Sequence, residues 1–375
     1  MVRWSDNRIR TENDGPTIPP SDGLAPMKAL LMRAHGDFSN LAVGQVPKPT
    51  LPDSRHVLVR LKAAALNHLD LWTLGGLPGI SLAFPHILGG DGAGVVEEVG
   101  SEVRAVKPGD RVMINPGISC YGCEYCLAGD HSLCTTFRVL GEHLPGTLAE
   151  FVAVPELNVA VIPTLLKPHA EITWAEAAAF SMVTLTAWRM LITRAKVKPG
   201  EVVLIWGVGG GVSLAALRIA KLAGARVIVT SGTDEKLARA MALGADVALN
   251  HQATDVAKEV HRLTNRRGAD VIVDNVGEST WEQSLRALGR GGRLVTCGGT
   301  TGHNLVTDVR KLFWYQWSIL GSTMGGHAEY REIVRVLGQG NLRPSVDSTW
   351  PLDRVAEGLE RLKNGGQFGK VVVEI

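Results

Sequence analysis

Four of the five cysteines lie close together, in a spacing suited to metal binding. The segment reads Cys120-Tyr-Gly-Cys123-Glu-Tyr-Cys126, and Cys134 follows after seven further residues. Four thiolates so spaced can close a tetrahedral cage around Zn²⁺, and an all-cysteine cage leaves no open coordination position. We therefore expect one structural zinc. Disulfides and an iron–sulfur cluster are the alternatives, but no secretory signal is visible and iron–sulfur clusters usually space their ligands differently.

A second segment with chemical potential runs from Glu201 to Lys221, where an apolar strand breaks into glycines and a helical pattern follows. Glycines remove the side chain where the backbone turns tightly, so that a pyrophosphate can approach the N-terminus of the next helix. The glycines concerned are Gly207, Gly209, Gly210 and Gly211. Similar turns occur without a ligand, so the elements around this one must decide its role.

Strands and helices alternate after this turn. Strands are expected at RVIVTS, VALNH, DVIVDNVG and GRLVTCGG, and helices over residues 234–243, 254–264 and 279–288. This alternation predicts an α/β fold with a doubly wound, parallel Rossmann sheet, and the glycine turn occupies its first strand-to-helix corner. Because ligands bind at the carboxyl ends of such strands, we expect a dinucleotide there.

The preceding residues, from 27 to about 156, form short strand-like runs separated by proline and glycine, which predict a partly open β-barrel. Residues 1–26 are polar and rich in proline, aspartate and asparagine, so we expect a flexible extension, either a remnant of an upstream start or a functional tail. The predicted division is a barrel-containing catalytic domain over 27–183 with a four-cysteine lobe at 115–140, a Rossmann domain over 184–320 and a return to the catalytic domain over 321–375.

Composition excludes several classes of protein. The 39 basic and 37 acidic residues nearly cancel, which disfavours a nucleic-acid or membrane-surface partner. The stretch at residues 202–217 carries no Asp, Glu, Lys or Arg, but it is interrupted by glycines and is shorter than the roughly 20 apolar residues that a membrane span needs. We expect a cytoplasmic enzyme that acts on a small molecule.

In its barrel, four-cysteine lobe, Rossmann part and returning C-terminus, the chain resembles the zinc-type alcohol dehydrogenase superfamily, the medium-chain dehydrogenases and reductases. The likeness extends from residue 27 to residue 375 and implies a GroES-like barrel. Similarity to the quinone oxidoreductase-like branch rests on Asn67-His68-Leu69-Asp70, LGGDGAG at 88–94 and Leu185-Thr186-Ala187-Trp188. The resemblance also implies a homodimer or homotetramer, in which residues 318–322 could supply an edge strand that pairs across the dimer.

The resemblance also shows what this chain lacks. Zinc-dependent alcohol dehydrogenases are expected to carry a cysteine near Asn67, a Gly-His-Glu motif where this chain has Gly89-Gly90-Asp91, and a third ligand near Ser181 or Met182. A catalytic zinc is therefore not expected, and oxidation of simple alcohols would lose its Lewis acid. The alternative is an unusual metal site formed by His68, Asp70 and His86.

The second Rossmann strand bears on the choice of cofactor. NAD enzymes usually place an acidic residue at its end to bind the ribose 2′-hydroxyl, but this strand ends in Ser231 and Gly232, and Lys236 follows. NADPH is therefore favoured over NADH. Asp234 and Glu235 argue the other way, although acidic residues at that position also suit a helix N-terminus.

The predicted activity is NADPH-dependent hydride transfer to an enone, enoyl thioester or quinone. The alternatives are an alcohol or aldehyde dehydrogenase with a non-standard metal site or none, and a catalytically retired cofactor-binding protein. Asn67, His68 and Asp70 are the candidate catalytic residues. The glycine turn and the second Rossmann strand predict the cofactor-binding residues Gly207, Gly209, Gly210, Gly211, Val212, Ser231 and Lys236. The resemblance adds Asn67, Thr186, Asn250, His251, Val276, Gly298, Phe368 and Lys370. Phe313, Trp314 and Trp317 suggest either an apolar substrate pocket or core packing.

Overall fold

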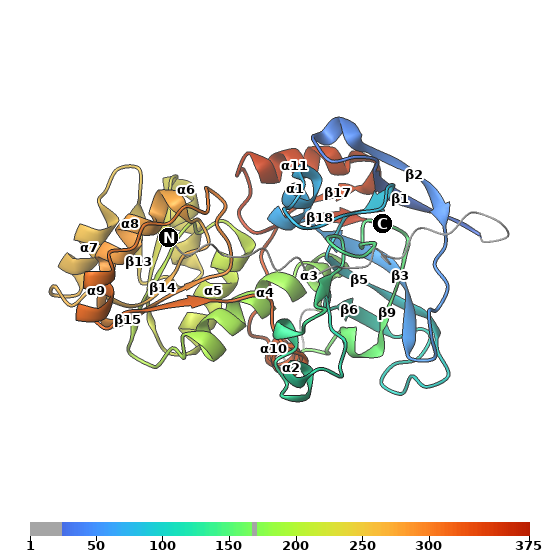
Figure 1. Ribbon diagram of the computed structural model, residues 1–375, viewed down its shortest axis with the longest axis horizontal. Coiled ribbons are helices and arrows are strands. Elements are labelled where there is room, and N and C mark those ends of the chain that lie inside the picture. The colour runs from blue at the N-terminus through green and yellow to red at the C-terminus, as the bar shows by residue number, and fades with distance from the viewer. Residues whose placement is uncertain (1–24, 167–170) are drawn as a thin grey trace, which may run out of the picture.

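The computed structural model of the chain describes residues 25–166 and 171–375, so most of the expected N-terminal extension lies outside the described residues. Two lobes lie side by side: a mainly helical and parallel-stranded one and a β-rich one (Figure 1). The β-rich lobe contains both the first described strand and the last (Figure 1).

The β-rich lobe is built on a seven-stranded sheet in the order β10–β6–β5–β3–β18–β17, with β9 also paired to β3, and on a three-stranded sheet, β2–β1–β4. Val57, Val59 and Leu61 of β3 are buried in one apolar cluster, and Leu58 on the other face of the strand is buried too. The strands are β1 (Pro26–Met32), β2 (Leu41–Pro47), β3 (His56–Ala65), β4 (His86–Ile87), β5 (Asp91–Val99), β6 (Arg111–Ile114), β9 (Phe151–Pro155), β10 (Val159–Val161), β17 (Val346–Pro351) and β18 (Lys370–Glu374).

The second lobe contains one parallel sheet, in the order β13–β12–β11–β14–β15–β16. Its central strand is apolar on both faces: Val203 and Ile205 belong to one core cluster, and Val202 and Leu204 belong to another on the opposite face. The strands are β11 (Val202–Ile205), β12 (Arg226–Ser231), β13 (Val247–Asn250), β14 (Ala269–Val273), β15 (Leu288–Thr296) and β16 (Ser318–Gly321), and the helices are α5 (Gly211–Leu222), α6 (Asp234–Ala242), α7 (Val256–Leu263), α8 (Glu278–Ala287) and α9 (Val309–Trp314). The predicted α/β class is confirmed.

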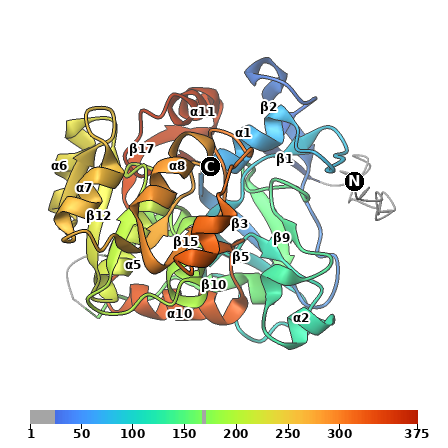
Figure 2. The same cartoon turned by 60° about the vertical axis from the view of Figure 1, so that its left-hand side comes forward.

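Helices lie at the junction between the lobes (Figure 1), and one of them, α10 (His327–Gly338), lies along the lower edge of the molecule in the turned view (Figure 2). The helix α4 (Ser181–Trp188) is buried along nearly its whole length and continues into a π-helical segment, Arg189–Arg194. It packs against α5 of the Rossmann lobe and against α10 (His327–Gly338). The expected domain boundary at 183–184 falls inside this helix, so one rigid element carries side chains into both lobes.

The remaining elements surround the barrel. They are α1 (His68–Gly75), α2 (Glu124–Leu127), α3 (Trp174–Ala178), α11 (Val355–Lys363) and the short strands β7 (Gly117–Ile118) and β8 (Arg138–Val139). The helix α2 and strands β7 and β8 lie in the segment that contains the four cysteines.

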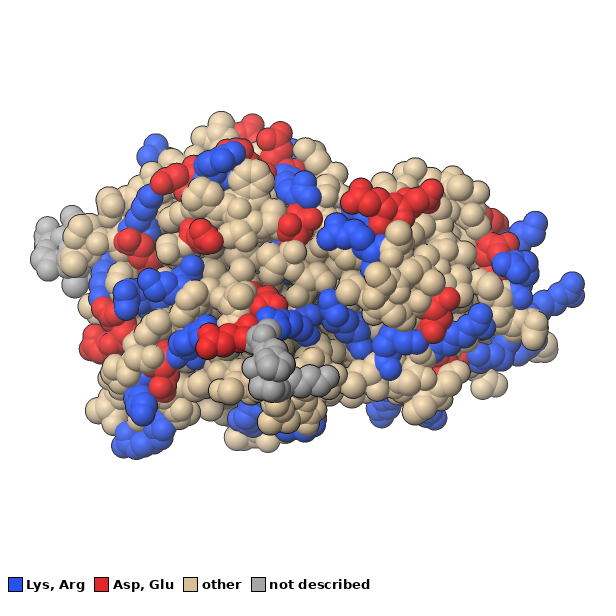
Figure 3. Space-filling view, turned by 180° about the vertical axis from the view of Figure 1, so that it is seen from behind, with Lys and Arg blue, Asp and Glu red and all other residues tan. Residues whose placement is uncertain are grey.

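On the surface seen from behind, basic and acidic side chains are mixed over both lobes (Figure 3). This mixture agrees with the nearly balanced sequence charge. Among the described residues, no helix combines the length and apolarity required to cross a membrane.

Candidate active site and metal site

A cavity of about 800 Å³ lies between the lobes and is lined by both. Fourteen of the seventeen sequence-predicted catalytic and cofactor residues line it: Asn67, His68, Thr186, Gly207, Gly209, Gly210, Gly211, Val212, Ser231, Lys236, His251, Val276, Gly298 and Lys370. Asp70, Asn250 and Phe368 do not.

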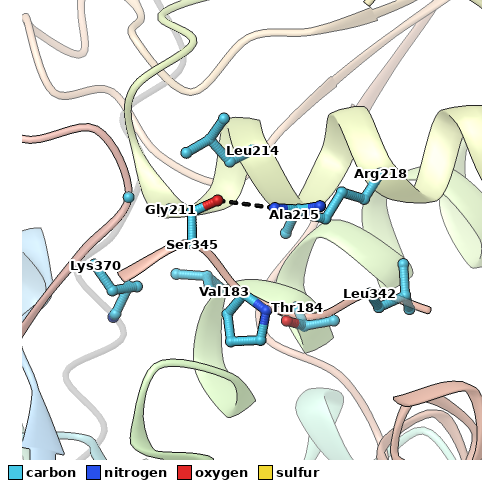
Figure 4. A pocket seen from close by; sticks show the side chains of 11 residues that line it. Val183, Thr184, Gly211, Leu214, Ala215, Arg218, Leu342, Ser345 and Lys370 are labelled. Atoms are coloured by element: carbon cyan, nitrogen blue, oxygen red, sulfur yellow. Dashed lines mark hydrogen bonds between the residues drawn. The ribbon is translucent and has the colours of Figure 1, made fainter. Parts of the chain in front are cut away.

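The glycine turn opens α5 at one wall of this cavity. Gly210 is the N-cap residue and supplies no side-chain acceptor, so the amides of the first turn face the cavity without a capping partner. A Cβ at Gly211 would lie 2.8 Å from Val183 Cγ1 and 2.9 Å from Lys370 Cδ. Figure 4 shows these three residues around a small gap of about 10 Å³, too small for a cofactor. Glycine therefore lets α4, α5 and β18 meet at the corner where an anion would bind.

Two side chains in the cavity wall have a buried acceptor oxygen without a partner among the described residues. Asn275 Oδ1 and Gln367 Oε1 have no hydrogen-bond partner among the described residues, and both residues line the cavity. Buried polar atoms are rarely left unpaired unless a ligand or water satisfies them. Together with the uncapped helix amides, they fit a nucleotide whose phosphates accept and whose sugar or amide groups donate hydrogen bonds.

The floor of the cavity carries a buried network of three side chains. Lys370 Nζ donates to Asn67 Oδ1 at 2.5 Å and to Asp91 Oδ2 at 2.8 Å, and Asn67 Nδ2 donates to the same carboxylate oxygen at 3.1 Å. The other oxygen of Asp91 accepts from the backbone N–H of Met182 at 2.8 Å. Strands β3, β5 and β18 are neighbours in the sheet, and this order brings the three residues together.

His68 begins α1 beside this network and lines the cavity. Burial, and then the positive charge of Lys370, lower the pKa of His68, so its imidazole is neutral near pH 7 and keeps one N–H donor.

Asp70 is not positioned as a catalytic group. Its carboxylate accepts from the backbone N–H of Asn67 at 2.7 Å and of Gly89 at 2.9 Å, and the side chain lies behind the cavity wall. Burial raises the pKa of Asp70 to about 6, against the opposing effect of these hydrogen bonds. The residue caps α1 and fixes Gly89. The prediction missed this role, although an Asn followed three residues later by an acid at a helix start is a capping signal.

At the opposite end of the cavity, Ser231, Gly232, Lys236 and His251 form the wall. Asn250 is turned away, because its amide donates to Asp234 Oδ1 at 2.8 Å. Phe368 is buried beneath the Arg239 guanidinium, which lies 4.1 Å from the ring centroid.

Several lining residues escaped prediction from sequence. Glu142 is the only carboxyl side chain among the described residues that line the cavity. Asp91 does not line the cavity but bonds to Asn67 and Lys370, which do, and in the sequence it stood out only as a departure from a metal-binding motif. Phe313 and Trp314, by contrast, are each 66% exposed and lie outside both the cavity and the core. Trp317 packs against the core of the Rossmann lobe.

The four cysteines converge as expected. Their sulfur atoms all lie within 4.8 Å of one another, with Cys123–Cys126 at 3.6 Å and Cys120–Cys126 at 3.9 Å. Sulfurs about 2.3 Å from a tetrahedral zinc lie about 3.8 Å apart, so the donor set and its spacing fit that ion. In the described parts of the chain, no other group of three or more His, Cys, Asp or Glu residues could hold a metal, so His68, Asp70 and His86 do not assemble one.

Comparison with known families agrees with this geometry. Residues 53–164 match the alcohol dehydrogenase GroES-like domain, and residues 211–339 match the zinc-binding dehydrogenase family. A zinc-type alcohol dehydrogenase-like protein of Schizosaccharomyces pombe is 33% identical over 90% of this chain and 96% of its own length. The chain belongs to the zinc-type alcohol dehydrogenase superfamily. It is an NAD(P)-dependent oxidoreductase of the medium-chain type.

Other members of this superfamily span several activities. A solved NAD-dependent alcohol dehydrogenase is 45% identical, with a TM-score of 0.87 over 93% of this chain and 100% of its own. An acryloyl-coenzyme A reductase of Metallosphaera sedula is 28% identical over 92% of this chain and 99% of its own length, and human quinone oxidoreductase is 29% identical over 86% and 90%.

Proposed function

We propose that this enzyme is an NADPH-dependent reductase of activated C=C bonds or quinones that works without a catalytic zinc. The observation that carries the proposal is the position of the Lys370 ammonium, which bonds to Asn67 and Asp91. Asn67 lies near the position at which the resemblance places a cysteine ligand of the catalytic metal, and Asp91 takes the place of the glutamate in the Gly-His-Glu motif. A fixed positive charge therefore replaces the Lewis acid.

Packing around Gly90 supports the absence of that metal. This position corresponds to the histidine of the Gly-His-Glu motif, and a Cβ on Gly90 would lie 2.5 Å from Met182 Cε. The end of the Met182 side chain occupies the space that a histidine ligand would enter, so a histidine here would have to displace it. Asp91, at the glutamate position, is already bonded to Lys370 and to the Met182 amide.

The floor network suggests how a carbonyl would be held. An ammonium has three N–H donors, and Asn67 and Asp91 occupy two of those of Lys370. We assign the third N–H of Lys370 and the N–H of neutral His68 as hydrogen-bond donors to the substrate oxygen. Negative charge develops on this oxygen as hydride is transferred. Bound reduced nicotinamide would supply that hydride. Asn67 becomes a positioning residue, because its amide is fully engaged with Ala65, Asp91 and Lys370.

The preference for NADPH rests on the wall formed by Ser231, Gly232 and Lys236. Among the described residues that line the cavity, no carboxylate lies at this end to repel a 2′-phosphate. Lys236 Nζ donates to the Gly365 carbonyl at 2.5 Å, which holds the cation at the rim. Asp234 is paired with Asn250 and does not line the cavity.

The test is a panel of enones, quinones and primary and secondary alcohols, assayed with NADPH, NADH, NADP⁺ and NAD⁺ and with metal content measured. Reduction of enones or quinones by protein that holds one zinc per chain supports the proposal. Alcohol oxidation that needs a second metal would instead indicate a dehydrogenase with a non-standard site. Tight NADPH binding without any turnover would indicate a retired enzyme.

We also propose a homodimer formed through the free edge of β16. This strand ends the parallel sheet, and the exposed Val309, Phe313, Trp314 and Ile319 lie on it or on the adjoining α9. Sedimentation should give a dimer or a dimer of dimers. Changing Ile319 to Pro should yield monomers, whereas a wild-type monomer would contradict the assignment.

A further inference from the structure

Glu142 lies in a tight turn of the barrel lobe and is the one acidic side chain among the described lining residues of the cavity. The turn follows β8, where the backbone N–H groups of Glu142 and His143 donate to the Val139 carbonyl at 3.2 and 2.9 Å. Glu142 lines the cavity together with Val139 and Trp72.

The backbone of this turn is firmly held. Gly141 has a φ of +77°, and a Cβ there would lie 2.6 Å from the backbone of Gly89. His86 Nε2 donates to the Gly141 carbonyl at 3.2 Å. The turn is thus fixed against the loop that precedes Asp91, so the carboxyl of Glu142 has a defined place in the wall.

The electrostatic surroundings of Glu142 favour a protonated carboxyl. Its side chain is only 15% exposed, and no Lys or Arg of the described residues lies within ion-pair distance. His143 Nδ1, 3.5 Å from Glu142 Oε2, accepts the Val139 N–H at 3.3 Å and therefore carries no proton.

The titratable groups around Glu142 leave its protonated form favoured. Burial raises the pKa of Glu142, while burial and then the charge of Arg138 lower the pKa of His143. Burial also lowers the pKa of His86, against its bond to Gly141. Of the other lining residues, His68 is neutral and the Lys370 charge is paired with Asp91.

We propose that Glu142 is the proton donor of the reductase and that the natural substrate is an α,β-unsaturated carbonyl compound. The inference rests on the proposed function. Hydride from the reduced nicotinamide forms a C–H bond at the β-carbon, and the C=C electron pair moves to give an enolate. Glu142 then gives its proton to the α-carbon, becomes a carboxylate and is reprotonated by solvent, so the net change is C=C reduction with oxidation of the cofactor.

The test compares the wild type with Glu142→Gln, Glu142→Asp and the control Glu98→Gln, a change on the exposed side of β5. Each enzyme reduces an α-methyl enone with NADPH in D₂O. We expect the wild type, Glu98→Gln and Glu142→Asp to place deuterium on one face of the α-carbon. Glu142→Gln should lose about 100-fold or more in kcat and give both epimers, with NADPH binding unchanged. A single epimer from Glu142→Gln, with an unchanged pH profile, would overturn the proposal.

Infrared titration of the substrate-free protein separates this inference from the proposed function. Burial also raises the pKa of Asp70 to about 6, so the difference spectrum between the wild type and Glu142→Gln is used to isolate Glu142. A carboxylic acid band should persist in this difference spectrum above the pH at which surface glutamates ionise. If no C=C compound is reduced but the band is present, the proposed function fails while the protonated state of Glu142 stands. If the band is absent, Glu142 cannot serve as the donor whatever the substrate.

Discussion

Lys370 Nζ lies 2.8 Å from Asp91 Oδ2, and both side chains are almost completely buried. A buried pair of this kind gains little over an apolar pair, but leaving one partner unpaired is strongly unfavourable. The lysine therefore has two roles that can be separated experimentally: it neutralises Asp91 within the fold, and it presents a positive charge to the cavity.

Replacing Lys370 by Met should destabilise the protein by about 3–5 kcal/mol, because the carboxylate of Asp91 would remain buried without a cation. Chemical denaturation measures this loss. The double variant Lys370→Met/Asp91→Asn should recover much of the stability, since Asn can still accept the Met182 N–H, but it should not recover reductase activity. Recovery of both would show that the ammonium has no part in the chemistry.

Cys126→Ser should abolish zinc binding at the four-cysteine site and lower the unfolding free energy by roughly 3 kcal/mol or more. Part of that loss is expected at the junction, because Asp130 of the same segment bonds to Arg189 Nη2 at 2.5 Å. Elemental analysis should find one zinc per chain in the wild type and in Cys297→Ser, the matched control at the fifth cysteine. A zinc-free wild type that keeps its fold would contradict the assignment.

Lys236→Met should weaken NADPH binding by about tenfold or more and leave NADH binding nearly unchanged, because a charge-assisted contact to a 2′-phosphate contributes about 1.5–3 kcal/mol. Fluorescence titration with both nucleotides gives the two dissociation constants. Lys258→Met, at an exposed position of α7, is the control for a lost surface charge. Tighter binding of NADH than NADPH by the wild type would refute the preference.

His327 should make the protein sensitive to acid. Burial, and then the neighbouring His131, lower the pKa of His327 from 6.5 to about 4. In the unfolded chain, His327 binds a proton below about pH 6.5, whereas in the folded chain it stays neutral until about pH 4. The folding stability that is present above pH 6.5 is therefore lost progressively as the pH falls from 6.5 to 4. The loss amounts to about 3 kcal/mol at most.

Denaturation of the wild type and His327→Gln across pH 4–7, with zinc content monitored, tests this. The variant should show a flatter pH dependence, while His303→Gln, at an exposed position, should follow the wild type. If the unfolding free energies of the wild type and His327→Gln depend on pH in the same way, His327 is excluded as the source of the acid sensitivity.

The parts of the site that sequence predicts well are those formed by neighbouring residues. The four cysteines and the glycine turn each occupy a short segment, so their spacing alone indicates their geometry. The Asn67–Asp91–Lys370 network depends instead on the order of β3, β5 and β18, which no local pattern specifies. Strand order is set by burial and pairing over the whole lobe.

Other differences have equally definite physical causes. Asp70 was predicted to be catalytic because it follows Asn67 and His68, yet its place three residues into α1 directs the carboxylate to backbone amides. Glu142 was missed because a single acid in a loop has no periodicity. Its significance depends on burial and on the absence of a nearby cation within the described residues.

The position of β18 between β3 and β17 also bears on biosynthesis. Val372 pairs with Ala65, and the whole parallel sheet lies between them in the chain. On the ribosome, the Rossmann lobe can form from consecutive segments, whereas the edge of β3 must wait for a strand synthesised much later. During that interval the Ala63–Ala65 end of β3 lacks its β18 partner and Asp91 lacks its cation, so we expect the nascent barrel to depend on a chaperone more than the Rossmann lobe does.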